Sequence, residues 1–226
     1  MSKNTTNNIP LICHKCGCVI NVNFHSHVDD SMSEEITRII DGSFFTRKCE
    51  KCGESIVLNF PVGYHNIKTN KDVLFLPINT NAQSQSISIP DNARVTHELF
   101  AFIEKVRISE MGLDDKIIEL VKVVAYNQVS ELGKVPGESL ESIGCGVKDD
   151  KSLELDLRCG GRHYLLEVPY QMYLDVEGKF GEILKRWQEP KVVDMNWSLM
   201  FLNAMLIEEC ETIQDVNYDD WDEIIF

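Results

Sequence analysis

Two short stretches near the N-terminus alternate apolar and polar residues. Their apolar positions are Ile20, Val22 and Phe24 in the first stretch and Ile56, Leu58 and Phe60 in the second. Because successive side chains of a strand point to opposite faces, each stretch predicts a strand with one apolar face. We expect the two apolar faces to pack against each other.

A short helix is predicted between these two strands. Its apolar residues fall on one helical stripe, namely Met32, Ile36, Ile39 and Ile40. Ser31 and Glu34 have the spacing of a capping box, and Gly42 suits the end of a helix. The pattern therefore indicates one helix inserted between two similar strands.

The C-terminal two thirds of the chain predict three further groups of elements. Helical spacing over residues 95–106 and 117–124, on either side of Gly112, predicts a helical hairpin. Alternation over residues 153–157 and 164–168, with Gly160-Gly161 between them, predicts a β-hairpin. Residues 180–187 and 197–207 predict two more helices, of which the last is expected to be largely buried.

A pair of cysteines precedes each of the two N-terminal strands. The 12-residue segments that start at Cys13 and Cys49 share seven identical positions at an offset of 36, so they are copies of one small unit. In each copy Cys-x-x-Cys is followed by a glycine, which permits the positive φ of a metal-binding knuckle. We predict that Cys13, Cys16, Cys49 and Cys52 bind one structural zinc ion.

Four thiolates on one zinc ion leave no coordination position for water or substrate, so such a site stabilises a fold and does not catalyse. A redox dithiol or an iron centre is the alternative use of this pattern. Cys18 could be a spare ligand, but it corresponds to Glu54 in the second copy and is expected to be a bystander at the start of a strand. Cys145, Cys159 and Cys210 are scattered singly, which is typical of small buried apolar residues.

The remaining composition predicts a cytoplasmic protein. The N-terminus has no basic stretch followed by an apolar run, and no apolar stretch approaches the roughly 20 residues that span a bilayer. Thiols are kept reduced in the cytosol, so eight cysteines favour metal binding over a disulfide framework. We expect no contact with a membrane.

The net charge of -14 is unevenly spread. Residues 1–77 hold eight Lys or Arg and eight Asp or Glu, whereas residues 78–226 hold 14 and 28. An acidic surface repels phosphate backbones and favours basic partners. The last 19 residues carry eight carboxylates together with Tyr218, Trp221 and Phe226, which is too aromatic for a plain solvated tail.

Three histidines are weaker candidates for chemistry. His25 and His27 open a segment that resembles the His-x-His-x-Asp-His metal motif of metallo-β-lactamase-like hydrolases, but Asp30 replaces its last histidine. We interpret the segment as polar residues that end a ribbon strand. His65 could act as a general base, although no serine or cysteine nucleophile with a sequence signature accompanies it, so a structural role is favoured.

Four basic residues gather around the cysteines in the sequence, namely Lys15, Arg47, Lys48 and Lys51. They could form a phosphate-binding patch, or they could offset the double negative charge of a four-thiolate zinc centre. The neutral balance of residues 1–77 favours the second interpretation.

The order of motifs resembles the CpXC-domain family, which is named for two Cys-Pro-x-Cys motifs that flank a short helix. The likeness includes the segment 61–66 that follows the second strand, and later segments 104–108 and 112–120, so that it covers roughly residues 11–130. His14 and Glu50 stand where proline is usual, which should cost some knuckle rigidity and no ligand. The resemblance implies a bacterial or archaeal zinc-ribbon protein from a family without an assigned activity.

The sequence therefore predicts an α+β fold: a two-knuckle zinc ribbon with an inserted helix, then a helical hairpin and a C-terminal β-hairpin-plus-helix domain. Residues 1–78 form the CpXC-like zinc-ribbon domain. Residues 79–92, which are polar and interrupted by Pro90, form a linker or exposed loop, and residues 93–226 form an acidic α+β domain.

Three functions are compatible with these features. The first is a zinc-stabilised binding or scaffold module that acts through protein contacts, with a basic partner docked on the acidic region after residue 92. The second is a nucleic-acid-associated zinc ribbon, which the charge disfavours. The third is a metal- or histidine-dependent hydrolase that uses His25, His27 or His65. We favour the first, in which the protein is not an enzyme.

Overall fold

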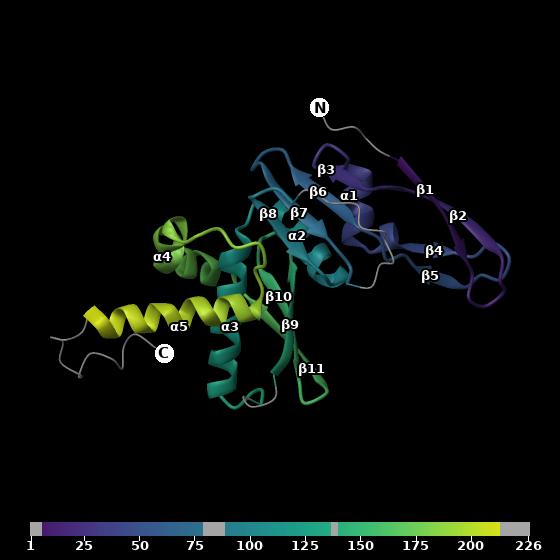
Figure 1. The fold of residues 1–226 in the computed structure, drawn as a ribbon. Coiled ribbons are helices and arrows are strands. Elements are labelled where there is room, and N and C mark those ends of the chain that lie inside the picture. Colours follow the sequence, from purple (N-terminus) through teal and green to yellow (C-terminus); the bar gives the residue numbers. More distant parts are fainter. Residues whose placement is uncertain (1–5, 79–88, 137–139, 213–226) are drawn as a thin grey trace. The chain divides into compact units, whose positions relative to one another are not determined.

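The computed structural model describes residues 6–78, 89–136 and 140–212, and its fold is mixed α+β, as predicted (Figure 1). The chain forms two compact units. The first contains Met1–Gly112 together with Glu189–Val192, and the second contains Leu113–Gln188 and Val193–Phe226.

Two β-hairpins carry the cysteines of the first unit. β1 (Thr6–Ile12) pairs antiparallel with β2 (Val19–His25), and β4 (Thr46–Lys48) pairs antiparallel with β5 (Ser55–Val57). The predicted apolar alternation is present, because Val22, Phe24, Leu58 and Phe60 are buried while the asparagines between them are exposed. β2 matches the first predicted strand, whereas the second ends at Val57, so that Leu58 and Phe60 are buried beyond β5. Each of the two strands pairs in a hairpin with a strand that the sequence did not predict.

Helix α1 (Ser33–Ile40) lies between the hairpins in the chain, as predicted, and buries Ile36 and Ile39. Gly42 follows it with a φ of 79°, which confirms the predicted end of the helix. The predicted capping box is wrong, because the N-cap position is Met32 and the hydroxyl of Ser31 donates to the Asp29 carboxylate instead. A single 3₁₀ turn, η1 (Ser43–Phe45), continues the chain into β4.

A four-stranded sheet with the order β3-β6-β7-β8 completes the first unit, and α2 (Leu99–Glu110) packs on β6, β7 and β8. The strands are β3 (His27–Asp29), β6 (Val62–Asn66), β7 (Lys71–Phe75) and β8 (Ala93–Thr96). β8 pairs parallel with β7. The first compact unit continues through this sheet and α2 to Gly112. Most of the predicted linker, residues 79–88, lies outside the described residues.

Phenylalanine rings form the centre of this unit. Phe45 lies in contact with Phe60, Phe75 and Phe102, with 5.9 Å between ring centroids in each pair. Aromatic side chains bury large apolar areas, and tilted or edge-on pairs of this spacing are favourable. One core, including Phe24, therefore runs from the hairpins to the sheet and α2.

Polar side chains of β6 bind α2 at the end of this core. Tyr64 is fully buried and its hydroxyl donates to the Glu110 carboxylate. Asn66 Nδ2 donates to Ser109 Oγ at 2.9 Å. Burial, reinforced by the Glu110 hydrogen bond, raises the pKa of Tyr64 well above its ordinary value. These contacts give Tyr64 and Asn66 structural roles.

Residues 189–192 bring the late part of the chain back to the first unit. The backbone amide of Val95 donates to the carbonyl of Lys191 at 2.7 Å, and Arg94, which is 4% exposed, pairs with the Glu189 carboxylate. A buried guanidinium is costly unless its donors are bonded, so this segment satisfies a charge that β8 buries.

The second unit combines three helices with a three-stranded antiparallel sheet of order β11-β10-β9. Its elements are α3 (Asp115–Glu131), β9 (Leu140–Val147), β10 (Leu153–Cys159), β11 (Arg162–Val168), α4 (Tyr170–Arg186) and α5 (Met195–Thr212). The predicted β-hairpin is confirmed as β10 and β11. β9 was missed, because its glycines and polar residues give no alternation.

Helices α2 and α3 exist on either side of Gly112, as predicted, and they fall in different compact units. Helix α3 packs with α4 and α5. One prediction for the last helix needs correction. α5 was expected to be largely buried. It buries Trp197, Phe201 and Met205 but exposes Leu199 and Met200. None of the described helices is both long enough and apolar enough to cross a membrane.

Phe100 and Phe102 of α2 differ in burial, and substitution of each tests the aromatic core of the first unit. Phe102 is fully buried and Phe100 is 83% exposed. Phe102→Ala should lower the free energy of unfolding by about 3–5 kcal/mol, because it leaves a cavity. Phe100→Ala should change it by less than about 0.5 kcal/mol. Amide hydrogen exchange of β6 and α2 in both variants measures this difference, and equal losses would contradict the assigned core.

Candidate metal centre

The turns of the two hairpins are built in the same way. In the first, the amide of Gly17 donates to the carbonyl of Cys13 at 2.8 Å and the amide of Cys13 donates to the carbonyl of Cys18 at 2.9 Å. In the second, Gly53 and Cys49 make the corresponding bonds, each of 2.8 Å. Both glycines have positive φ, 69° and 72°, as the sequence predicts. The sequence repeat is therefore also a structural repeat.

The two turns bring four sulfur atoms together. The Sγ atoms of Cys13, Cys16, Cys49 and Cys52 all lie within 4.8 Å of one another. Two contacts within this set cross between the hairpins, with 3.6 Å from Cys13 to Cys52 and 3.6 Å from Cys16 to Cys49. No disulfide joins them. Of all the residues that the structure describes, these four form the one group of three or more metal-ligating side chains with converging ligand atoms.

Cys18 lies closer to this cluster than a bystander would. Its Sγ atom is 3.2 Å from Cys49 Sγ and 3.4 Å from Cys16 Sγ, although it falls outside the set of four that are mutually close. The sequence repeat, which aligns Cys18 with Glu54, gave no sign of this contact. The cluster therefore has a fifth thiol at its edge.

Hydrogen bonding between thiols makes their protonation unequal. The hydrogen bond with Cys18 lowers the pKa of Cys49 to about 6, and the same contact raises the pKa of Cys18 to about 12. A thiolate is the form that binds metal. The thiols of the cluster are therefore unequal, because the pKa of Cys52, a predicted ligand, is also raised to about 12.

Ion pairs link the hairpins beside the sulfur atoms. Glu54 of the second turn lies 3.0 Å from Lys15 Nζ and 3.6 Å from His14 Nε2 of the first turn. His14 occupies a position where the family usually has proline. These exposed contacts contribute only modestly to stability, but they orient one turn against the other. Sequence reasoning had treated Glu54 only as the counterpart of Cys18.

His25 and His27, which belong to one sequence motif, lie in different surroundings in the structure, and His27 lies beside His65 instead. The His65 ring is 6.3 Å from that of His27, and His65 Nδ1 is 3.0 Å from Asp72 Oδ1, across β3, β6 and β7. His25 faces α1, with its Nε2 atom 3.9 Å from Glu35 Oε1. Within the described parts of the chain no histidine belongs to a converging set of metal ligands.

The basic residues near the cysteines do not act as one group. Lys15 is paired with Glu54, whereas Arg47 Nη1 donates to the carbonyls of Ser43, Phe44 and Thr46 at 2.8–3.3 Å. Arg47 therefore stabilises the 3₁₀ turn.

The later cysteines lie away from this centre in the sequence and in the second unit. Cys145 and Cys159 are buried, as predicted for small apolar residues. Burial raises the pKa of the Cys159 thiol, which favours its protonated form. The side chain of Cys210 lies outside the described part.

A protein with two equivalent cysteine knuckles at the turns of two hairpins, joined through a short helix, has the layout of the family that the sequence resembles. Residues 11–122 match the CpXC protein family, and the chain is a CpXC-domain protein over that range. No curated protein and no solved structure matches the chain. The family match extends through α2 into α3.

The knuckle glycines give a test of this geometry. An alanine side chain at Gly53 would meet no atom within 4 Å, but the φ of 72° is strained for any residue with a Cβ atom. Gly53→Ala should therefore lower the free energy of unfolding by about 1–2 kcal/mol. Hydrogen exchange of the β4–β5 amides measures it.

Gly178 is the matched control, because it is exposed within α4 and an added Cβ would also meet nothing within 4 Å. Gly178→Ala should stabilise its helix by about 0.5–1 kcal/mol. All three tryptophans belong to the second unit, so tryptophan fluorescence during urea unfolding reports this change. Effects of the same sign in the two variants would contradict the assigned backbone strain.

Proposed function

We propose that Cys13, Cys16, Cys49 and Cys52 bind one structural zinc ion and that the protein is a zinc-stabilised binding module. The observation that supports the metal is the spacing of the sulfur atoms. Zinc–sulfur bonds of about 2.3 Å in a regular tetrahedron place the sulfurs about 3.8 Å apart. Two pairs within the set, Cys13–Cys52 and Cys16–Cys49, are separated by 3.6 Å, far beyond a disulfide bond.

The chemistry of the donor set favours zinc and a non-catalytic role. Four thiolates in tetrahedral geometry are typical of structural zinc and, less often, of iron. Four protein ligands leave no position for a reacting water. Zinc supplies cohesion at such a site, and here it would hold the β1–β2 turn to the β4–β5 turn.

The second unit offers the surface that best fits a protein partner. Leu199 and Leu206 share one face of α5, and Met200 lies about 100° further round the helix; they are 43%, 46% and 68% exposed. Single exposed apolar residues are ordinary, but a group of them on the exposed side of one helix suits a contact surface. Residues 195–212 contain no Lys or Arg and three glutamates, which favours a basic partner with an apolar anchor.

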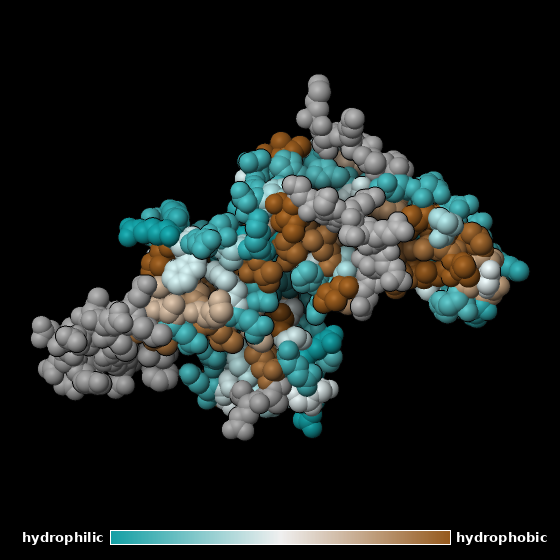
Figure 2. Space-filling view, in the orientation of Figure 1, coloured by the Kyte–Doolittle hydropathy of each residue, from teal (hydrophilic) through white to brown (hydrophobic). Residues whose placement is uncertain are grey.

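The hairpins carry a competing apolar surface. Figure 2 shows brown side chains over this part of the first unit, where Ile12, Val19 and Val57 are 72%, 63% and 67% exposed. Ile12 and Val19 face each other across the β1–β2 ladder next to the cysteine turn. We place the proposed partner on α5 and not on the hairpins, because the sequence of α5 is acidic whereas residues 1–77 carry equal numbers of acidic and basic residues. An acidic segment favours a basic partner.

Metal content is the direct test of the zinc proposal. Protein purified without added metal should contain one zinc per chain, and Cys49→Ser should lose it together with the folded hairpins, because zinc binding energy is also folding energy. Cys145→Ser, a buried cysteine of the second unit, is the matched control and should keep the zinc. Elemental analysis decides. Iron in place of zinc, or a ratio near two, would contradict the proposal.

Two apolar residues of similar exposure, Met200 on α5 and Leu165 on β11, test the proposed partner surface. Met200→Ser should weaken capture of a basic partner by about tenfold or more, because a central apolar anchor contributes roughly 2 kcal/mol. Leu165→Ser on β11 is the control, since Leu165 is 72% exposed in the same unit. Capture from the native host with each full-length variant, quantified by mass spectrometry, measures the difference.

Two outcomes would contradict the proposed partner surface on α5. Loss of the same partner with Val19→Ser, and not with Met200→Ser, would place the contact on the hairpins. Binding of duplex DNA that weakens steeply with salt would instead favour the nucleic-acid alternative, because phosphate contacts release counterions.

A further inference from the structure

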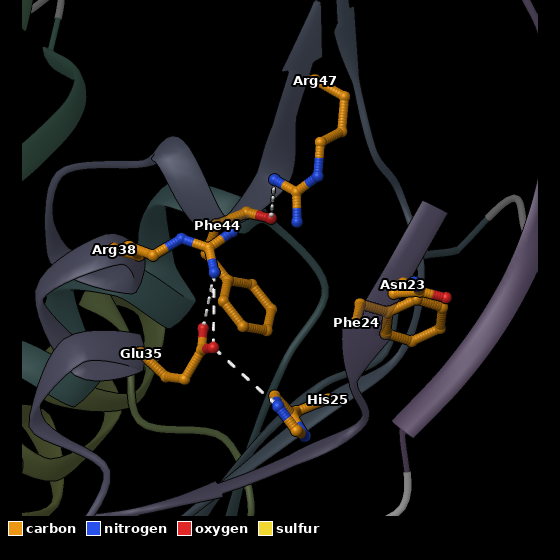
Figure 3. A pocket seen from close by; sticks show the side chains of 7 residues that line it. All are labelled: Asn23, Phe24, His25, Glu35, Arg38, Phe44 and Arg47. Carbon is orange, nitrogen blue, oxygen red and sulfur yellow. Dashed lines mark hydrogen bonds and ion pairs between the residues drawn. The ribbon is translucent and has the colours of Figure 1, made fainter. Parts of the chain in front are cut away.

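A recess of about 210 Å³ lies between the first hairpin, α1 and the segment that leads into β4 (Figure 3). Its lining comes from three separate parts of the first unit. The side chains are Asn23, Phe24 and His25 from β2, Glu35 and Arg38 from α1, Phe44 from η1, and Arg47 from β4.

Two guanidinium groups give this recess a positive balance. Arg38 Nη1 pairs with both carboxylate oxygens of Glu35, at 3.0 and 3.3 Å, so one of the two positive charges is neutralised. The charge of Arg47 has no carboxylate partner among the described residues. The lining thus carries one net positive charge even when His25 is neutral.

The guanidinium group of Arg47 is fixed by hydrogen bonds from one nitrogen, and its other two nitrogens keep free N–H donors. Three backbone carbonyls accept from its Nη1 atom, and no described atom accepts from Nη2 or Nε. The remaining Nη2–Nε edge is the planar fork that binds a carboxylate through two parallel hydrogen bonds.

Two phenylalanine rings and the ring of His25 make up most of the rest of the lining. Figure 3 shows the rings of Phe24 and Phe44 flanking the space that the two guanidinium groups border. His25 Nδ1 is buried without a hydrogen-bond partner, and its Nε2 atom is 3.9 Å from Glu35, too far for a hydrogen bond.

We propose that this recess binds a small monoanionic carboxylate with a planar apolar body, of the size of an aromatic acid. The Arg47 fork holds the carboxylate, and the body lies between Phe24 and Phe44. A monoanion matches the single net charge, whereas a phosphate dianion would meet the Glu35 carboxylate. This binding site is separate from the cysteine centre and does not depend on the partner surface of α5.

Benzoate is the probe, titrated by calorimetry and by ¹H–¹⁵N NMR into the full-length, metal-loaded protein. Saturable binding should shift amide signals mainly over residues 23–25 and 35–47. Benzyl alcohol, which has the same ring without charge, should not bind. Phenyl phosphate should bind more weakly than benzoate.

Arg47→Lys keeps the charge and can still donate to the carbonyls, but it loses the planar fork. It should weaken benzoate binding by about tenfold or more, since hydrogen bonds to charged groups are strong. Arg186→Lys on the exposed end of α4 is the matched control and should bind benzoate like the unaltered protein. Metal content and hydrogen exchange of the β4–β5 amides confirm that both variants fold.

Three results would overturn the site: equal affinity for benzoate and benzyl alcohol, unchanged affinity in folded Arg47→Lys, or shifts concentrated outside the lining residues. Tighter binding of phenyl phosphate would overturn the monoanion and assign the recess to phosphate esters.

Discussion

Short two-stranded hairpins are at most marginally stable by themselves in water, so β1–β2 and β4–β5 must be held by contacts outside their own ladders. Each hairpin is held at both ends. At the turn end the sulfur atoms of one hairpin meet those of the other, and at the opposite end Phe24 packs closely against Phe60, with tilted rings and 3.7 Å between their centroids. The helix, the sheet and the recess all depend on this pairing.

The aromatic contacts extend this restraint into the rest of the first unit. Phe60 touches Phe45, which in turn contacts Phe75 of β7 and Phe102 of α2. A change at the cysteine turns would therefore be felt in the sheet through packed rings, because close-packed interiors transmit strain. A structural metal at the turns would fix the register of both hairpins at once.

The proposed carboxylate site is a by-product of the same arrangement. The insertion of α1 between two hairpins leaves a space that neither the sulfur cluster nor the aromatic core fills. Arg47 is immobilised there for a structural reason, since it binds the carbonyls of the 3₁₀ turn. An immobilised guanidinium is also a good anion receptor, because less side-chain freedom is lost on binding.

The sequence by itself determined the local features whose cause is local. Repeat spacing predicted both knuckles and their positive-φ glycines, alternation predicted the two buried strand faces, and helical spacing predicted α1 to α5. These succeed because turn geometry and strand or helix periodicity depend on residues a few positions apart.

Only the tertiary structure decided the features that depend on distant partners. β8 joined the first unit through its pairing with β7, and α2 separated from α3, because strand pairing and packing join residues that no local pattern connects. Cys18 came within 3.2 Å of Cys49, and His25 turned from a supposed metal motif toward Arg38 and Glu35. The direction of these side chains depends on how the two hairpins pack against each other. Residue spacing along the sequence does not contain that information.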